Sequence, residues 1–237
     1  MLEAKDVTKS FRSGDGTVTA VKSVTMTVAS GEFVAIVGRS GSGKTTLMNL
    51  LGALEQPTSG VIEVDGQDIT RLGPGELVHY RGRKIGFVFQ SYNLVPNLTA
   101  IENVMLPMEF IGVGKGERRE RARRLLDHVE LTGAKQERKP SRLSGGEQQR
   151  VAIARALGNK PSIILADEPA GNLDTQTSAT IVELLRNLSR SEGTTVIVVT
   201  HDTSVADQAD SVLRLEDGQL ALTDLGDPGL GENRPRV

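Results

Sequence analysis

The chain has 237 residues, enough for one large domain, or one domain with an added lobe, and for a sizeable core without disulfides. Its 28 basic and 30 acidic residues give a formal net charge of −2, which argues against bulk attraction to nucleic acid or anionic lipid. The absence of cysteine excludes disulfide scaffolds, thiolate metal sites and cysteine nucleophiles. No stretch approaches 18 apolar residues and the first six residues do not resemble a signal peptide, so we expect any membrane role to be peripheral.

The first thirty residues have the pattern of β-structure. Residues 23–28 alternate polar and apolar side chains, the period of a strand with one wet face. Four later β-branched or aromatic runs are apolar on both faces, as in parallel strands covered by helices: 32–37, 84–89, 162–166 and 194–200. Helical patterns separate these runs: 44–51, 147–157 and 177–188. This alternation predicts an α/β fold with a mostly parallel sheet.

Each of the four buried runs ends at a glycine or a polar residue, in chain order Gly38, Gln90, Asp167-Glu168 and His201. Ligands of open α/β sheets gather at the carboxyl ends of the strands. A lone Gln or His at a strand end is more often an ordinary loop residue, but four strands that end in this way suggest one shared site.

The composition shifts between Gln90 and Ser144, and we expect a helical lobe, roughly residues 91–158, to be inserted between strands. The lobe contains a charged run, 116–124, in which two pairs have the i,i+4 spacing that supports an exposed helix: Glu117 with Arg121, and Glu120 with Arg124. An RNA- or lipid-binding patch is the sharper alternative, but basic runs of this kind are usually solvated faces. We treat residues 1–223 as one domain and expect 224–237, rich in Gly, Pro and charge, to be a disordered tail.

Residues 38–45 fit the pattern G-x-x-x-x-G-K-[ST] at every fixed position. Glycines let the backbone curl until successive N–H groups point at phosphate oxygens, and the following helix adds its positive N-terminal end. Lys44 would reach the β- and γ-phosphates, and the Thr45 hydroxyl would ligate Mg²⁺. The pattern follows an apolar strand and opens a helix, which distinguishes it from a flexible Gly/Ser turn. We predict that a nucleotide contacts Gly38, Arg39, Ser40, Gly41, Ser42, Gly43, Lys44, Thr45 and Thr46.

The apolar run 163–166 delivers two adjacent acids to the same sheet edge. Asp167 is placed to hold Mg²⁺ through water, as the second metal-side residue of a phosphate-loop site. Glu168 could polarise the attacking water as a general base. By themselves an Asp and a Glu after a strand often form a turn or a helix cap, but the phosphate loop in the same chain favours the catalytic interpretation.

Residues 143–150, Leu-Ser-Gly-Gly-Glu-Gln-Gln-Arg, precede an apolar-periodic helix. Ser-Gly-Gly alone would be a plain helix N-cap with exposed amides. The full octapeptide resembles the signature sequence of ATP-binding cassette (ABC) ATPases. The other motifs follow that family's order over about residues 2–222: phosphate loop, Gln90, signature, Asp167-Glu168, Asn172-Leu173-Asp174 and His201.

The resemblance implies a P-loop core with an N-terminal antiparallel β lobe and an inserted helical lobe, and a homodimer that forms on ATP binding. Each ATP would lie between the phosphate loop of one copy and the signature of the other, comprising Leu143, Ser144, Gly145, Gly146 and Glu147. On the same resemblance Gln90 senses Mg²⁺ and the attacking water, His201 contacts the γ-phosphate, and Asp174 couples the two sites. The implied cofactors are ATP and Mg²⁺, with Lys44 and Glu168 completing the catalytic set.

Phe11 occupies the position, after Lys9-Ser10, at which the family usually stacks an aromatic residue on adenine. Tyr is common there, and Phe keeps the ring without the hydroxyl. Stacking is worth about 1–3 kcal/mol per base. A core aromatic is the alternative interpretation of Phe11.

Segments 93–104 and 165–174 are similar to a narrower branch that contains macrolide exporters, lipoprotein-release ATPases, antimicrobial-peptide exporters and the cell-division ATPase. Ala170 departs from the Thr that members usually carry. The branch implies a location at the cytoplasmic face of the cell membrane and a separate permease subunit with few spans and a large extracytoplasmic domain. The task would be export, lipoprotein release or mechanotransmission.

Two alternatives belong to other functional classes. A soluble ABC ATPase that acts on ribosomes or DNA usually joins two cassettes or carries a long coiled-coil insertion, and this chain has neither. We therefore expect no nucleic-acid partner. A nucleotide-binding regulator without turnover would not need Lys44, Glu168 and His201 together. The resemblance implies that the membrane subunit selects the transported substrate.

Overall fold

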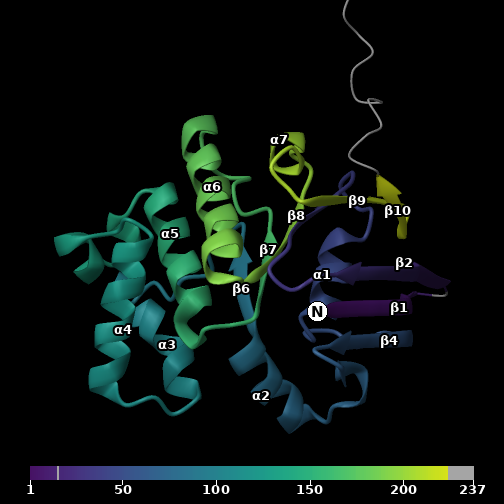
Figure 1. Ribbon diagram of the computed structural model, residues 1–237, viewed down its shortest axis with the longest axis horizontal. Coiled ribbons are helices and arrows are strands. Elements are labelled where there is room, and N and C mark those ends of the chain that lie inside the picture. The colour runs from purple at the N-terminus through teal and green to yellow at the C-terminus, as the bar shows by residue number, and fades with distance from the viewer. Residues whose placement is uncertain (15, 224–237) are drawn as a thin grey trace, which may run out of the picture.

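The computed structural model describes residues 1–14 and 16–223, and within them helices pack against two β-sheets (Figure 1). A six-stranded sheet occupies the middle of the molecule and a four-stranded sheet lies at one end. Three helices group at the other end: α3 (Ala100–Phe110), α4 (Lys115–His128) and α5 (Gly145–Ala156). This arrangement confirms the predicted α/β class. The predicted disordered tail, 224–237, lies outside the described residues.

The six-stranded sheet has the order β10-β9-β3-β8-β7-β6, and only β10 runs antiparallel to its neighbour. Its strands are β3 (Phe33–Val37), β6 (Ile85–Phe89), β7 (Ile163–Asp167), β8 (Thr195–Thr200), β9 (Ser211–Glu216) and β10 (Gln219–Thr223). The four predicted buried runs are β3, β6, β7 and β8, displaced by at most one residue at an end. The predictions did not include β9 and β10.

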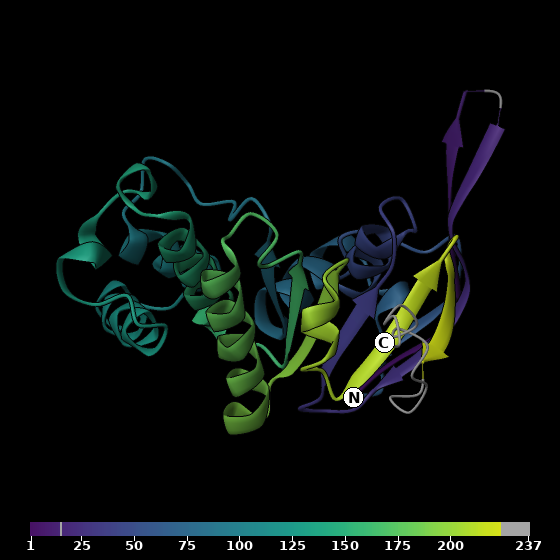
Figure 2. The same ribbon diagram turned by 90° about the horizontal axis from the view of Figure 1, so that it is seen from above.

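The four-stranded sheet is antiparallel, with the order β2-β1-β4-β5. Its strands are β1 (Leu2–Ser13), β2 (Gly16–Val28), β4 (Ser59–Val64) and β5 (Gln67–Asp68). The predicted alternation over 23–28 is confirmed, because Val24, Met26 and Val28 are buried and the residues between them are exposed. The paired end of β1 and beginning of β2 project away from the rest of the molecule (Figure 2).

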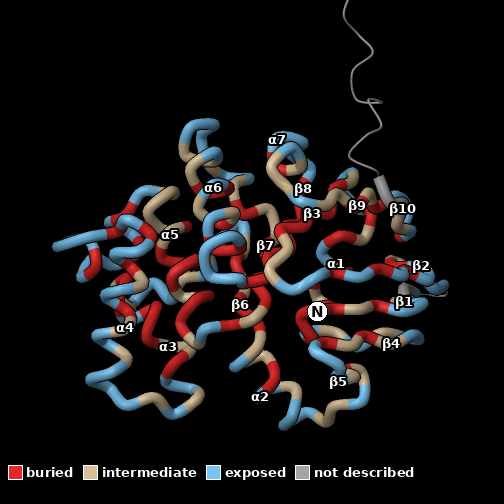
Figure 3. The backbone as a smooth tube through the Cα atoms, in the orientation of Figure 1, coloured by how far each residue is buried: buried red, intermediate tan, exposed pale blue. Residues whose placement is uncertain are grey.

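The residues of the central strands are mostly buried (Figure 3). They lie between two hydrophobic cores, and side chains that alternate along β8 enter opposite cores. In β8, Val196 and Val198 pack into the core that contains α3–α5 and α6 (Thr175–Glu192). Ile197 and Val199 pack into the core that contains α1 (Lys44–Leu51) and the four-stranded sheet. Burial on both faces explains why these strands are uninterrupted apolar runs.

The remaining helices are short, or lie at the edges of the sheets: α2 (Pro74–Lys84), α7 (Thr203–Ala206), and the 3₁₀ turns η1 (Ile69–Arg71), η2 (Gly133–Glu137), η3 (Pro140–Arg142) and η4 (Leu157–Asn159). Over the two described stretches, no helix combines the length and apolar character needed to cross a bilayer.

The charged run lies on α4, and acids neutralise most of its arginines. Arg124 pairs with Glu120 as predicted, whereas Glu117 and Arg121 form no ion pair within the described part of the chain. Three further arginines pair with acids elsewhere in the lobe: Arg118 with Glu109, and Arg119 and Arg123 with Glu137. This pairing favours a solvated face over an RNA- or lipid-binding patch.

Candidate functional site

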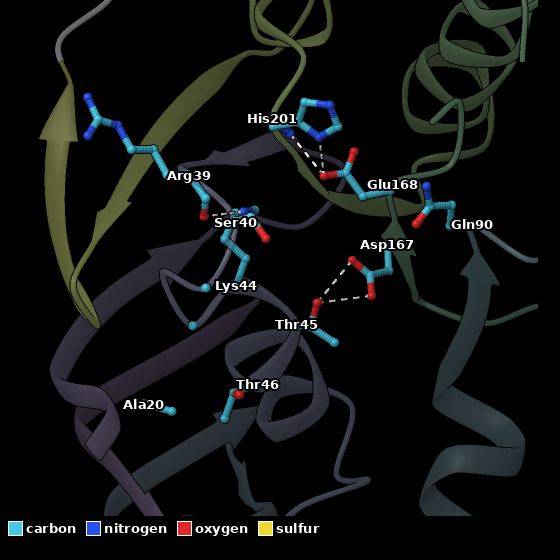
Figure 4. A pocket seen from close by; sticks show the side chains of 12 residues that line it. Ala20, Arg39, Ser40, Lys44, Thr45, Thr46, Gln90, Asp167, Glu168 and His201 are labelled. Atoms are coloured by element: carbon cyan, nitrogen blue, oxygen red, sulfur yellow. Dashed lines mark hydrogen bonds and ion pairs between the residues drawn. The ribbon is translucent and has the colours of Figure 1, made fainter. Parts of the chain in front are cut away.

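A cavity of about 670 Å³ lies where the carboxyl ends of β3, β6, β7 and β8 meet (Figure 4). The residues that line it are Ala20, Arg39, Ser40, Gly41, Gly43, Lys44, Thr45, Thr46, Gln90, Asp167, Glu168 and His201. The structure thus brings together the four strand ends that the sequence suggested would share a site. Ala20 reaches the cavity from β2, and no sequence signal pointed to it.

Two glycines of the phosphate loop have left-handed backbones, Gly41 with φ +79° and Gly43 with φ +99°. A Cβ on Gly43 would lie 2.1 Å from the Ala20 carbonyl oxygen, so only glycine allows the loop to approach β2 this closely. Gly43 is the N-cap of α1 and offers no side-chain cap, which leaves the first helix amides free for an anion. The local geometry is that of a phosphate cradle.

Lys44 is only 8% exposed, and its ammonium group lies inside the loop. Its Nζ donates to the Gly38 carbonyl at 2.8 Å and to the Arg39 carbonyl at 2.9 Å. An ammonium group has three donors, so one remains for a ligand in the cavity. The lysine is therefore held in place by the loop itself.

Thr45 and Asp167 lie next to each other on the cavity wall (Figure 4). The Thr45 hydroxyl is 3.2 Å from Asp167 Oδ2 and 3.4 Å from Oδ1. Burial raises the pKa of Asp167, with a further rise from the Glu168 charge, while the Thr45 hydrogen bond and the Lys44 charge lower it. A hydroxyl and one carboxylate are oxygen ligands that suit Mg²⁺, which usually completes its shell with phosphate and water oxygens. No cluster of three or more His, Cys, Asp or Glu side chains fit to hold a metal occurs among the residues the structure describes.

The Glu168 carboxylate is bonded by two consecutive residues at the end of β8. Its Oε1 accepts from the His201 backbone N–H at 3.1 Å and lies 2.7 Å from His201 Nδ1. Its Oε2 accepts from the Thr200 hydroxyl at 2.9 Å. Thr200 was not predicted as a site residue, although it carries a hydroxyl at the end of an apolar strand.

Gln90 is linked to the segment that follows Glu168. Its Nε2 donates to Asn172 Oδ1 at 3.2 Å, and Asn172 Nδ2 donates back to the Gln90 carbonyl at 3.1 Å. A Cβ on Gly171 would lie 2.9 Å from Gln90 Nε2, so glycine makes room for this contact. Two hydrogen bonds therefore link Gln90, on the cavity wall, to Asn172 at the start of the 172–174 segment.

The turn after Gln90 is held by hydrogen bonds from Arg155, near the C-terminal end of α5. Tyr92 and Asn93 both have positive φ, +60° and +49°, which is costly for non-glycine residues. The Arg155 guanidinium on α5 donates to the Tyr92 and Asn93 carbonyls. Burial of Arg155 lowers its pKa.

The signature forms the start of α5, with Ser144 as N-cap, as predicted. Ser144 Oγ accepts from the Glu147 N–H at 3.2 Å, and Glu147 Oε2 accepts from the Ser144 N–H at 2.9 Å, which is a reciprocal capping box. A side-chain hydrogen bond from Lys135, with a further one from the Ser144 backbone, lowers the pKa of Glu147. Leu143 is buried in the core.

The two signature glycines face neighbouring segments at close range. A Cβ on Gly145 would lie 2.8 Å from the Tyr92 hydroxyl, and one on Gly146 would lie 2.5 Å from Thr177 Cγ2. Residues 143–147 do not line the cavity. The structure of one chain therefore leaves the signature outside the site that contains the phosphate loop.

Asp174 and Phe11 also lie outside the cavity lining. Asp174 caps α6, where its carboxylate accepts from the Thr177 hydroxyl at 2.6 Å and from the Thr177 N–H at 3.0 Å, and these two bonds lower its pKa. Phe11 lies on β1 toward the projecting hairpin and is 39% exposed, which is unlike a core aromatic. The Lys9 ammonium lies 5.0 Å from the centre of its ring.

Comparison with known proteins identifies the family. A family model described as "ABC transporter" matches residues 21–171. An "Uncharacterized ABC transporter ATP-binding protein" of Thermotoga maritima is 50% identical over 220 residues, which cover 93% of this chain and 93% of that relative. A "Macrolide export ATP-binding/permease protein MacB" of Syntrophobacter fumaroxidans is 49% identical over 222 residues, but these cover 93% of this chain and 31% of the relative. The chain thus spans about a third of the length of that MacB protein.

A solved structure gives the same result for the fold. It is described as "Dimeric structure of a post-hydrolysis state of the ATP-binding cassette MJ0796 bound to ADP and Pi", and MJ0796 is a protein of Methanocaldococcus jannaschii. It matches with a TM-score of 0.87 and 46% identity, covering 93% of this chain and 96% of that one. The resemblance inferred from the signature is thereby confirmed: the chain belongs to the ABC transporter family, as one of its ATPase subunits.

Proposed function

We propose that two copies of this chain close around two ATP molecules and hydrolyse them to drive a separate membrane permease. The observation that carries this proposal is the division of the site. The cavity holds the phosphate loop, Lys44, Asp167 and Glu168, while the signature at Ser144 lies outside it. A second copy would bring its own signature to the open side of the cavity. The dimeric MJ0796 structures support this arrangement by similarity.

Within each site, we assign binding of the triphosphate to the loop. The α1 amides and the third donor of Lys44 would neutralise phosphate charge, and phosphoryl transfer depends mainly on such positioning and neutralisation. Thr45 and Asp167 fit an Mg²⁺ ion, which would supply charge neutralisation of the phosphates when bound. Gln90, at the adjacent strand end, would sense that occupancy and relay it through Asn172.

We assign the role of general base to Glu168, and contact with the terminal phosphate to His201. An ionised carboxylate has about four acceptor sites, of which three are taken by Thr200 and His201, so one remains for a water molecule. The partner's Ser144, Gly145 and Gly146 amides would complete the cage around the phosphate. Asp174, exposed at the start of α6, would contact the opposite copy.

The permease partner is proposed from the relatives. MacB carries both "ATP-binding" and "permease" in its name, and this chain spans about a third of it. A separate integral membrane subunit with few spans and a large extracytoplasmic domain would supply the rest, and the ATPase would sit at the cytoplasmic face of the membrane. Export, lipoprotein release or mechanotransmission are the processes that fit this branch.

The test uses two variants and a matched control. Glu168→Gln should keep ATP binding, give a long-lived dimer on size-exclusion chromatography with ATP-Mg²⁺, and slow hydrolysis at least ~100-fold, the size of a lost general base. Ser144→Arg should block hydrolysis without weakening ATP binding to the monomer, because Ser144 serves the neighbouring copy. Ser141→Arg, also exposed and three residues earlier, should leave both properties unchanged.

Three outcomes would contradict the proposal. Near-normal hydrolysis by Glu168→Gln would remove Glu168 from its role. Collapse of monomer ATP binding in Ser144→Arg would contradict the shared site. Co-purification with ribosomes or DNA, in place of an integral membrane protein, would contradict the permease partner.

A further inference from the structure

Thr200 is the last residue of β8, and its hydroxyl is directed at the Glu168 carboxylate. The residue is only 2% exposed, and its Oγ1 lies 2.9 Å from Glu168 Oε2. Three contacts from the same chain segment therefore hold the carboxylate, one from the Thr200 hydroxyl and two from His201, through its backbone N–H and its Nδ1.

The direction of the Thr200 hydrogen bond follows from counting protons. A hydroxyl has one proton to donate. The Asp202 backbone N–H donates to Thr200 Oγ1 at 3.0 Å and so occupies an acceptor position of the hydroxyl. An ionised carboxylate can only accept, so the single hydroxyl proton points at Glu168 Oε2.

Thr200 and His201 differ in how firmly they can hold Glu168. The His201 side chain is 68% exposed and can turn toward a ligand. The Thr200 side chain is buried at the end of a central strand, and its branched Cβ restricts it to few rotamers. The Thr200 hydroxyl and the His201 backbone N–H are thus the fixed contacts of the carboxylate, one on each oxygen, and the His201 imidazole is the adjustable one.

The backbone of Glu168 is tied to the same strand end. Its N–H donates to the Val199 carbonyl at 2.8 Å, and its φ of +46° turns the chain out of β7 at this residue. Val199 therefore holds the main chain and Thr200 holds one carboxylate oxygen, which together fix the direction of the side chain.

We propose that Thr200 is a positioning residue for hydrolysis: its hydroxyl orients the Glu168 carboxylate so that the remaining acceptor site is available to the attacking water. The proposal rests on the general-base role proposed for Glu168. It does not involve ATP binding, because Thr200 does not line the nucleotide cavity.

The test compares Thr200→Val, which keeps the shape and removes the hydroxyl, with Thr200→Ser, which restores it. Thr195→Val is the matched control, because Thr195 is also buried on β8 and, among the residues the structure describes, its hydroxyl bonds only to backbone atoms of Ala29 and Gly31. We expect Thr200→Val to lower kcat about tenfold, the effect of one lost hydrogen bond to a charged group. KM and the ATP Kd should stay within about twofold, and Thr200→Ser and Thr195→Val should keep kcat near that of the wild type.

A second measurement separates this proposal from the role of Glu168 itself. If Thr200 acts through Glu168, Thr200→Val should cause no further loss of single-turnover rate in a Glu168→Gln background. Should Thr200→Val fail to fold, Thr200→Ala gives the same comparison. Unchanged kcat in the hydroxyl-free variant, with Glu168→Gln inactive, would overturn the role of Thr200 and leave the proposed function standing. Near-normal hydrolysis by Glu168→Gln would overturn both.

Discussion

Alanine substitutions at two glycines of the phosphate loop should differ in cost because their surroundings differ. At Gly41, with φ +79°, a Cβ would meet nothing within 4 Å, so Gly41→Ala should cost only the backbone penalty of about 1–2 kcal/mol. At Gly43, with φ +99°, the Cβ would also lie 2.1 Å from the Ala20 carbonyl oxygen. A main-chain atom of a paired strand cannot move freely, so overpacking should add about 1–3 kcal/mol.

Thermal melting of the purified chain measures this difference. For a chain of this size 1 kcal/mol corresponds to roughly 2–4 °C in Tm, which gives a fall of about 2–8 °C for Gly41→Ala and about 4–20 °C for Gly43→Ala. ATP affinity should fall further in Gly43→Ala, because the loop must move away from β2. Equal Tm values for the two variants would refute the argument that contact with Ala20 shapes the loop.

Three further predictions concern other parts of the site. Burial raises the pKa of Asp167, so ionisation of this carboxyl lowers the stability of the folded chain as the pH rises through the acidic range. Asp167→Asn should therefore raise Tm at pH 7, and this gain in Tm should shrink toward acid pH. The same substitution should abolish Mg²⁺-dependent hydrolysis. Arg155→Met should lower stability by about 1–3 kcal/mol in denaturant titration, because two left-handed residues, Tyr92 and Asn93, lose their clamp. Phe11→Ala should weaken ATP binding by about 1–3 kcal/mol in calorimetry, with little change in Tm because Phe11 is exposed; unchanged affinity would count against stacking on adenine.

The central strands were predictable because burial on both faces leaves an uninterrupted apolar run. The edge hairpin β9–β10 was not predicted, since β9 buries only Leu213 and Leu215 and also carries the charged residues Arg214 and Glu216. The turn of this hairpin, Asp217-Gly218, has positive φ at both residues, and Asp-Gly between two apolar runs is a sequence signal that favours a hairpin. The turn between β4 and β5, Asp65-Gly66, also has the Asp-Gly sequence and positive φ at both residues.

The phosphate loop and the strand-end residues were predictable because fixed chemistry demands fixed residue types at short spacing. The contact of Ala20 with the loop was not predictable, because it is made by the backbone carbonyl, which every residue type has. The bonds of Glu168 to Thr200 and of Gln90 to Asn172 join segments far apart in the sequence, so only the folded chain reveals them.

The position of β3 has a consequence for synthesis of the protein. This strand leads into the phosphate loop, yet both of its neighbours, β8 and β9, come from the last part of the described chain. The Gly218 N–H then braces the loop by donating to the Ser42 carbonyl at 3.1 Å. A nascent chain on the ribosome therefore has no partner strand beside β3 until β8 and β9 have been synthesised, and competence to bind ATP should be acquired only after that point.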